Sequence, residues 1–378
     1  MPAVFLLWVF FLAWAGVTLV MNDNEGRFFG AIYRLSLYMS AGLLAVYTYN
    51  ARYSLSVWRV TGAMVWFLAG MTVCGYLALA FPEATLRTPM AWIMPDSLAS
   101  NELVGQMVVR QMSSWNPDAW VEEAVRLVAP FLYANTWGNV YSLVLPMALL
   151  NLWLVWRTRY RWPVLLVIAA SVYPALSTLN RGMFVGLAIV AAWVLIQMLR
   201  RGWVLAVGAS LSAIAAAGAI WYFSPLGAAM LNRVETTSSI EDRGQLYRTT
   251  LEAVLQSPLF GYGSPRPAES PWLPSLGTQG QLWTVLYSHG FVGAVLFTAF
   301  FVAVCAIVLR RGDVVGVVLG GIILATLAEM VFYGMMTGIM VTMIAVALAL
   351  RTDTVISSED RPGTGARRSA THFPRGRV

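Results

Sequence analysis

The chain has 378 residues, of which 58% are hydrophobic and only 11% are charged, and its formal net charge is +7. Soluble domains carry about 25% charged residues, so the composition excludes an ordinary soluble domain. It also argues against nucleic-acid binding, because the basic residues, all of them arginines, stand at the ends of apolar runs and do not cluster on one polar face.

Apolar runs of about 20 residues, the length that an α-helix needs to cross a bilayer, recur along the whole chain. Backbone polar groups in lipid must be hydrogen-bonded within their own segment, so each run predicts a helix. The first run lacks a preceding positively charged region and is interpreted as an uncleaved span. The sequence therefore predicts an all-α polytopic membrane protein, with a single transmembrane domain over residues 1–350 and about ten transmembrane helices: Ala3–Met21, Phe29–Tyr49, Val60–Phe81, Pro130–Trp156, Trp162–Leu179, Gly182–Leu199, Gly202–Phe223, Leu282–Leu309, Val314–Val331 and Gly334–Leu350.

Two long polar loops, at about residues 82–128 and 224–281, interrupt these spans. In the first loop, the apolar periodicity of Asn101–Met112 and Pro117–Leu127 predicts short interfacial helices. In the second loop, Asp242–Gln256 is predicted to be helical, with acidic residues at its favourable N-terminal end and a rigid cluster of glycine and proline turns after it. Residues 351–378 are rich in Ser, Gly and Arg and predict a disordered tail.

The arginines of the short connections predict the orientation in the membrane. If the N-terminus is cytoplasmic and the number of spans is even, these arginines and the tail all lie on the cytoplasmic side, as the positive-inside rule requires. Both long loops are then extracytoplasmic. The arginines concerned are Arg52, Arg59, Arg157, Arg159, Arg161, Arg200, Arg201, Arg310, Arg311 and Arg351.

Four arginines of the predicted outer side could hold phosphate or carboxylate groups. Arg181 stands in a turn of barely two residues between two spans, although a cation that reaches from a helix end to the interface is the alternative. Arg243 and Arg248 lie about 140° apart on the predicted outer helix and could equally form surface ion pairs. Arg266 lies between two prolines.

Several other polar residues are candidates for binding or catalysis. Ionisable groups inside a span, such as His289 and Glu329, are functional hypotheses by default, and a buried structural role is the alternative for His289. Gln279 and Gln281 can donate and accept hydrogen bonds but cannot act as strong bases. Asn135 lies where an aromatic stretch leads into a span. No phosphate-binding loop, zinc motif or nucleophile elbow occurs, so neither a metal nor another cofactor is predicted.

Three segments, taken in order, carry a family resemblance: Arg126–Asn135, Asn180-Arg181-Gly182, and the stretch from Arg243 through Pro258-Leu-Phe-Gly-Tyr-Gly263 to Gly290-Phe-Val-Gly293. Together they resemble the O-antigen ligase and O-antigen polymerase superfamily of bacterial membrane glycosyltransferases, over roughly the C-terminal two-thirds of the chain. The resemblance implies a GT-C-like helical fold in the bacterial cytoplasmic membrane. It also implies metal-independent transfer of a glycan from a polyprenyl-diphosphate carrier to an acceptor hydroxyl of a glycan or glycolipid on the outer side.

The resemblance further implies roles for particular residues. Arg181 and Arg243 would hold the diphosphate, because fixed guanidinium groups can stabilise a leaving group without Mg²⁺. Arg248 and Arg266 are further candidates for the same role. Asn135, Tyr262 and Gln281 are expected in the substrate groove.

The chain departs from the family at a position of interest for catalysis. Many members carry a histidine, the usual candidate for activating the acceptor, about eleven residues before the glycine that matches Gly290, and this chain has Gln279 there. Gln279 and His289 are therefore the candidate catalytic residues. Two alternatives stay open: a non-catalytic glycolipid transporter or flippase, and a degenerate scaffold of an envelope-polysaccharide assembly complex.

Overall fold

The computed structural model describes residues 1–95, 105, 107–114, 126–236, 239–266 and 275–351, with the backbone alone for residues 232–236 and 239–243. Apolar helices dominate it. They are α1 (Phe5–Val17, continued by the 3₁₀ turn η1, Thr18–Met21), α2 (Glu25–Asn50), α3 (Val57–Ala80), α6 (Ala134–Val155), α7 (Arg161–Ser177), α8 (Arg181–Arg200), α9 (Val204–Tyr222), α12 (Gln281–Val308), α13 (Val314–Glu329) and α14 (Gly338–Ala349).

Each predicted span overlaps one of these helices. Six of them, namely α2, α3, α6, α8, α9 and α12, are long and apolar enough to cross a membrane. The apolar helices α1, α7, α13 and α14 are shorter. The predicted class, a helical membrane protein, is thus confirmed, whereas ten complete crossings and a GT-C-like arrangement stay predictions.

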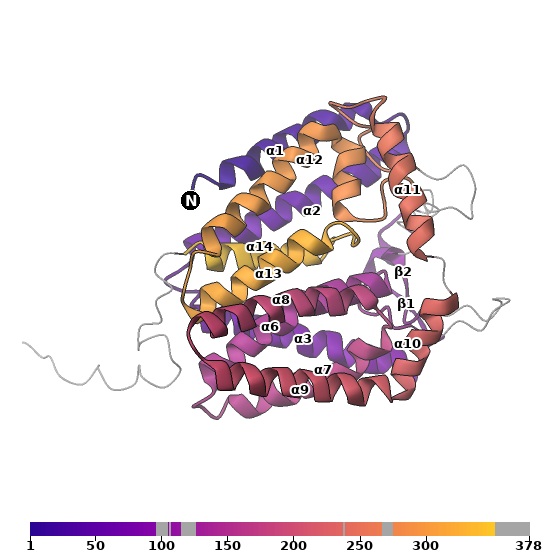
Figure 1. The fold of residues 1–378 in the computed structure, drawn as a ribbon. Helices are drawn as coiled ribbons and strands as arrows, with labels where there is room; N and C mark the ends of the chain where they lie inside the picture. Colours follow the sequence, from indigo (N-terminus) through magenta and orange to yellow (C-terminus); the bar gives the residue numbers. More distant parts are fainter. Residues whose placement is uncertain (96–104, 106, 115–125, 237–238, 267–274, 352–378) are drawn as a thin grey trace, which may run out of the picture.

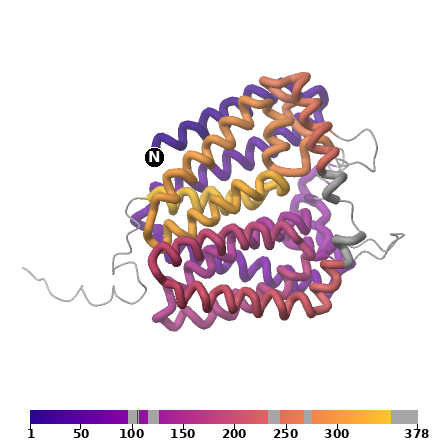
Figure 2. The backbone as a smooth tube through the Cα atoms, in the orientation of Figure 1, coloured from indigo at the N-terminus to yellow at the C-terminus, as the bar shows by residue number. Residues whose placement is uncertain are grey.

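The helices run side by side between two ends of the bundle (Figures 1 and 2). The centre is formed by α6, which packs on α3, α7, α8, α13 and α14, while α9 lies at the edge against α8 and α10. Among the described residues of α9, Val207 alone is buried. The core is therefore built around α6 and α13, and α9 presents nearly all of its apolar surface outward.

The end of the bundle that carries the arginine-rich connections is tied together by arginine side chains. Arg351, which follows α14, donates to the carbonyl oxygens of Leu55 (2.6 Å) and Thr48. Arg311 donates to the carbonyl oxygens of Ala349 (2.7 Å) and Arg351 (3.0 Å). These bonds join the end of α14 to the α2–α3 and α12–α13 connections, so the arginines satisfy backbone carbonyls at helix ends.

The opposite end carries the long loops and differs in part from the prediction. The described part of the first loop contains strands β1 (Thr85–Arg87) and β2 (Val109–Gln111), paired antiparallel with Leu86 opposite Arg110, and the 3₁₀ turn η2 (Pro89–Trp92). The predicted helix over Asn101–Met112 is therefore wrong for its last turn. A short strand needs a partner from elsewhere in the chain, and local periodicity carries no record of that partner.

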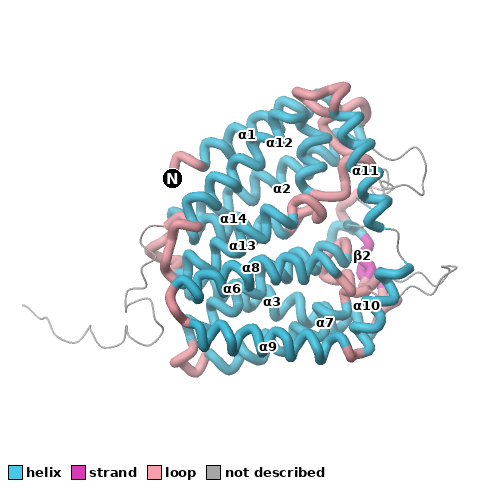
Figure 3. The backbone as a smooth tube through the Cα atoms, in the orientation of Figure 1, coloured by secondary structure: helices cyan, strands magenta, loops and turns pink. Residues whose placement is uncertain are grey.

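The second loop contains helices α10 (Pro225–Thr236) and α11 (Ser239–Val254), which lie at the same end as the strands (Figure 3). The predicted helix over Asp242–Gln256 is confirmed as α11, which begins three residues earlier, and α10 was not predicted. Most of the predicted helix Pro117–Leu127 and nearly all of the predicted tail 351–378 lie outside the described residues.

A backbone junction interrupts α12. Gly290 has φ 66° and ψ −170°, which breaks the helix. The segment Pro258–Ser264 lies against the break and forms three backbone hydrogen bonds there: Phe291 N–H to Pro258 O (2.8 Å), Tyr262 N–H to Tyr287 O (2.9 Å) and Gly263 N–H to Ser288 O (2.8 Å). Backbone groups that lose their helical partners at the break are thus hydrogen-bonded to this segment, as is required in an apolar environment. The two glycine-rich motifs of the sequence are the two halves of this junction.

The topology prediction can be tested by labelling with a membrane-impermeant maleimide. Glu83 and Ser54 are exposed and lie just beyond the two ends of α3. In a chain with Cys74 and Cys305 replaced, Glu83→Cys should be labelled on intact cells, whereas Ser54→Cys should be labelled only after permeabilisation. The opposite pattern would invert the predicted orientation.

Substitution of Gly290 tests the junction. A Cβ added to Gly290 would lie 2.2 Å from the carbonyl oxygen of Leu259. This backbone conformation also costs a non-glycine residue about 1–3 kcal/mol. We therefore expect Gly290→Ala to lower the melting temperature of the detergent-purified protein. Gly208→Ala on α9 is the control, because a Cβ there meets nothing within 4 Å. Equal melting temperatures for the two variants would contradict the prediction that the junction at Gly290 requires glycine.

Candidate functional site

A cavity of about 440 Å³ opens at the bundle end that carries α11 and the strands. Its walls come from α2, α6, the start of α12 and the turn before α14. The polar residues in its lining are Tyr33, Arg34, Tyr38, Tyr133, Asn135, Thr136, Ser275, Thr278, Gln279, Gln281, Thr284 and Tyr333. Of the predicted site residues, Asn135, Gln279 and Gln281 are thus brought together around one space.

Gln281 holds two walls of this cavity in place. Its side-chain amide donates to the Tyr38 hydroxyl of α2 (2.7 Å) and accepts from the backbone N–H of Met335 (3.1 Å). The side chain is buried. With its amide engaged on both sides, Gln281 fixes the start of α12 against α2 and the turn that precedes α14.

Gln279 lies at the rim, where α11 touches the cavity wall. The Tyr247 hydroxyl of α11 lies 3.1 Å from the carbonyl oxygen of Gln279 and 3.2 Å from that of Val331. The Tyr247 ring also stacks on Trp283, with ring centroids 4.4 Å apart. The backbone at Gln279 is thereby held, and its partly buried side chain lines the cavity.

Arg34 is the cation of this cavity. It lies nine residues after the first residue of α2, roughly 13 Å along the helix axis. Its electrostatic neighbours are Tyr38, Tyr133 and Tyr33. In the part of the chain that the structure describes, the guanidinium of Arg34 makes no hydrogen bond or ion pair with another side chain or carbonyl. An unpaired guanidinium inside a helical bundle is costly unless a ligand completes it.

A second cavity, of about 430 Å³, adjoins the first and shares Tyr133 and Asn135 with it. Two further arginines line it. Arg126 donates to the carbonyl oxygen of Thr178 (3.0 Å) and to Oδ1 of Asn135 (3.2 Å). Arg110 of β2 has Tyr33 and Tyr133 as electrostatic neighbours, and burial lowers the pKa of its guanidinium. Over the described residues, neither cavity has a carboxylate in its lining.

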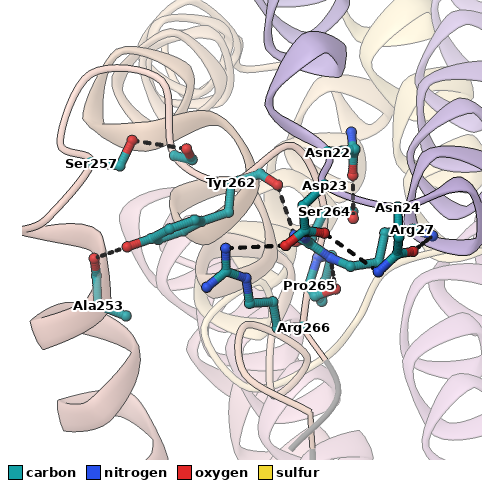
Figure 4. Close-up of polar contacts among 11 residues, drawn as sticks. Asn22, Asp23, Asn24, Arg27, Ala253, Ser257, Tyr262, Ser264, Pro265 and Arg266 are labelled. Carbon is teal, nitrogen blue, oxygen red and sulfur yellow. Dashed lines mark hydrogen bonds and ion pairs between the residues drawn. The ribbon is translucent and has the colours of Figure 1, made fainter.

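Tyr262 and Arg266 lie elsewhere, in a cluster around Arg27 (Figure 4). Buried Arg27 donates to the carbonyl oxygens of Tyr262 (2.8 Å) and Ser264 (2.7 Å) and pairs with Asp23. This hydrogen bond from Arg27 lowers the pKa of the Asp23 carboxyl. Arg27 thus fastens the loop after α11 to the beginning of α2.

The two predicted site residues of this cluster are engaged with protein groups. Arg266 pairs with Asp23 (3.3 Å), and its guanidinium lies 4.6 Å from the centroid of the Tyr262 ring. The Tyr262 hydroxyl donates to the carbonyl oxygen of Ala253 (2.8 Å). Neither residue lines the two cavities. The structure therefore does not bring Tyr262 and Arg266 together with Gln279, Gln281 and Asn135.

His289 is buried in the contact between α1 and α12. Its Nδ1 shares a hydrogen bond with the Thr18 hydroxyl (2.6 Å), and its carbonyl oxygen accepts from the Trp14 indole (2.9 Å). The ring meets Phe11 and Tyr38 edge to face. His289 does not line either cavity, so its observed contacts are those of a packed, hydrogen-bonded interior residue.

The remaining predicted arginines differ in position. Arg181 begins α8 directly after Asn180, which donates to the carbonyl oxygen of Ala134 (3.2 Å) and accepts from the Tyr333 hydroxyl of the cavity wall. Arg181 is thus one residue from the wall without lining it. Arg248 is exposed and pairs with Glu252 (2.9 Å). Arg243 lies on α11, with its side chain outside the described residues.

Glu329, at the end of α13, is buried and accepts from the Asn139 side chain of α6 (2.6 Å), so it joins two central helices. Within the described residues, no group of three or more His, Cys, Asp or Glu side chains is arranged to hold a metal ion. The predicted independence from metal is not tested by this observation.

Sequence reasoning missed Arg34 and Arg110. Arg34 lies inside the predicted span Phe29–Tyr49, so the rule that an ionisable residue inside a membrane helix is a functional candidate could have found it. Arg110 was assigned to a helix of the first long loop. Its position in a strand beside the cavity depends on the pairing with Thr85–Arg87, which the local sequence does not reveal.

Comparison with known proteins gives one match. Residues 166–298 match a family model described as O-antigen ligase, which confirms the predicted resemblance. No curated protein and no solved structure matches the chain. The matched region runs from within α7 to within α12 and includes Gln279 and Gln281, whereas Arg34, Arg110 and Asn135 lie before it.

Proposed function

From the premise that this membrane protein carries an O-antigen ligase domain, in a family of glycosyltransferase-like enzymes, we propose that it transfers a glycan from a polyprenyl-diphosphate carrier to an acceptor hydroxyl. The reaction would take place on the outer side of the bacterial cytoplasmic membrane. The acceptor would be another glycan or a glycolipid.

The observation that carries the proposal is the guanidinium of Arg34, which lines the cavity without a partner among the described residues. A polyprenyl chain lies in the bilayer, so its diphosphate stays near the ends of the membrane helices. Arg34 lines the cavity at the end of the bundle where α6 and α12 begin, so a headgroup that enters this cavity meets it. A guanidinium can hold two phosphate oxygens at once through parallel hydrogen bonds.

The cavity also supplies what the transfer step requires. The acceptor hydroxyl attacks the anomeric carbon and releases its proton to the departing diphosphate or to water. The bond from that carbon to the diphosphate oxygen breaks, and negative charge grows on the departing diphosphate. A cation already in position stabilises this charge without reorganisation. Gln279 and Asn135, which line the same space, can orient the acceptor hydroxyl by hydrogen bonds. Arg181 and Arg243 are further candidates for the diphosphate, because α8 and α11 begin at this end of the bundle.

Substitution of Arg34 tests the proposal. We expect Arg34→Gln to lower kcat by about 10²-fold or more in an assay with a purified lipid-linked donor, because charge stabilisation of the leaving group is lost. Arg34→Lys should fail nearly as badly, since lysine lacks the bidentate fork.

Stability and a control variant complete this test. Removal of a partly buried cation that has no partner among the described residues should leave the melting temperature unchanged or higher. The control is Arg159→Gln, a change of an exposed arginine at the opposite end of the bundle. Full transfer by Arg34→Gln would refute this assignment and favour a non-catalytic role for the cavity.

A second pair of variants separates Gln279 from His289. Gln279→Ala should slow transfer only modestly, because a positioning contact contributes less than a general base, which typically gives 10²–10⁴-fold. Gln279→His should be tolerated. His289→Ala should act through stability, since it removes the bond to Thr18. Transfer per folded molecule and melting temperature are the two measurements. A stable but inactive His289→Ala variant, with Gln279→Ala fully active, would assign the role in transfer to His289 and leave Gln279 without one.

A further inference from the structure

The second cavity has a charge that the transfer of a neutral glycan does not require. Arg110 of β2 lines it, and its guanidinium forms no hydrogen bond or ion pair with the described residues. Its electrostatic neighbours, Tyr33 and Tyr133, are neutral hydroxyl donors. Two arginines of adjoining cavities, Arg34 and Arg110, therefore share Tyr33 and Tyr133 as electrostatic neighbours, and no carboxylate of the described residues lines either cavity.

A site whose described polar groups are cations and neutral donors is complementary to anions. Thr85, Gln111 and Ser114 add neutral hydrogen-bonding groups to the lining of this second cavity. Arg126 is directed to Asn135 and the Thr178 carbonyl, which leaves Arg110 as the cation available to a ligand.

The place of Arg110 indicates which part of a substrate it would meet. The β1–β2 hairpin lies beyond the ends of the membrane helices (Figure 1), whereas Arg34 lies within one of them. A lipid-linked glycan that places its diphosphate near Arg34 would extend its sugars away from the bilayer, toward the hairpin. The two cavities share Tyr133 and Asn135 in their linings, so they lie next to each other along this direction.

We propose that the Arg110 cavity is a subsite for an anionic group on the saccharide itself, either the carboxylate of an acidic sugar or a phosphate substituent. This inference rests on the proposed function and adds a substrate preference to it. Arg110 then determines specificity for acidic glycans, whereas Arg34 serves the diphosphate that every donor carries.

The test uses the full-length protein in proteoliposomes with three polyprenyl-diphosphate-linked oligosaccharides. They differ at one sugar, which is neutral, carries a carboxylate or carries a phosphate. We expect Arg110→Gln to raise KM for one of the charged substrates by about 10-fold or more, the size of a lost charge-assisted hydrogen bond, and to leave KM and kcat for the neutral substrate unchanged. The charged substrate with the larger change identifies the preferred group.

Two variants serve as controls on the same hairpin. Arg87→Gln changes an exposed arginine of β1 that lines neither cavity, and it should alter no substrate's kinetics. Arg110→Lys keeps the charge and should retain part of the preference. Equal losses by Arg110→Gln on all three substrates would assign Arg110 to the diphosphate and overturn the inference. The absence of any change would overturn it as well.

A binding measurement separates this inference from the proposed function. Lipid-free oligosaccharides with and without the charged sugar are titrated into the wild-type protein and Arg110→Gln, and binding is followed by calorimetry. A preference for the charged sugar that disappears in Arg110→Gln supports the subsite even if Arg34→Gln transfers normally and the proposed function fails. Equal binding of both sugars to the wild-type protein refutes the subsite and leaves the proposed function standing.

Discussion

The constraint on which this architecture depends is that a helix may break in an apolar bundle only if other groups satisfy its backbone. The break of α12 at Gly290 meets this requirement through the loop Pro258–Ser264, which donates to and accepts from the exposed backbone. The first segment of α12 thereby takes its own direction. Gln281, at its start, reaches Tyr38 and Met335 and forms the cavity wall. The junction thus connects the loop after α11 to the geometry of the candidate site.

Two arginines of α2 illustrate how the same side chain serves structure or ligand binding. Arg27 is buried and directs its donors to carbonyl oxygens and Asp23, so its charge is fully used within the protein. Arg34, two helical turns further on, has tyrosine rings around it and no acceptor among the described residues. Taking a guanidinium out of water costs free energy at both positions. Among the described residues, protein groups offset that cost only at Arg27. An anionic ligand is the natural partner for the other.

Part of the candidate site could be predicted from the sequence, and where the structure places residues elsewhere, the reason is physical. Asn135, Gln279 and Gln281 were predicted and line one cavity, because they stand where helices begin at the same end of the bundle. Tyr262 and Arg266 were predicted for substrate but bind protein groups, since the loop turns them toward Arg27 and Ala253. Which way a loop side chain points depends on contacts that are distant in sequence. The same reason explains why the strand at Arg110 was predicted as a helix.

The sequence by itself determined the class of protein, the positions of the apolar helices and the gathering of the arginine-rich connections at one end of the bundle. These features follow from hydropathy and from helix length, which are properties of contiguous segments. Tertiary structure alone decided that Arg34 and Arg110 face adjoining cavities, that His289 is packed against Thr18, and that two glycine motifs form one junction. Such relations join residues of different helices, and helix packing sets them through contacts that no single segment encodes.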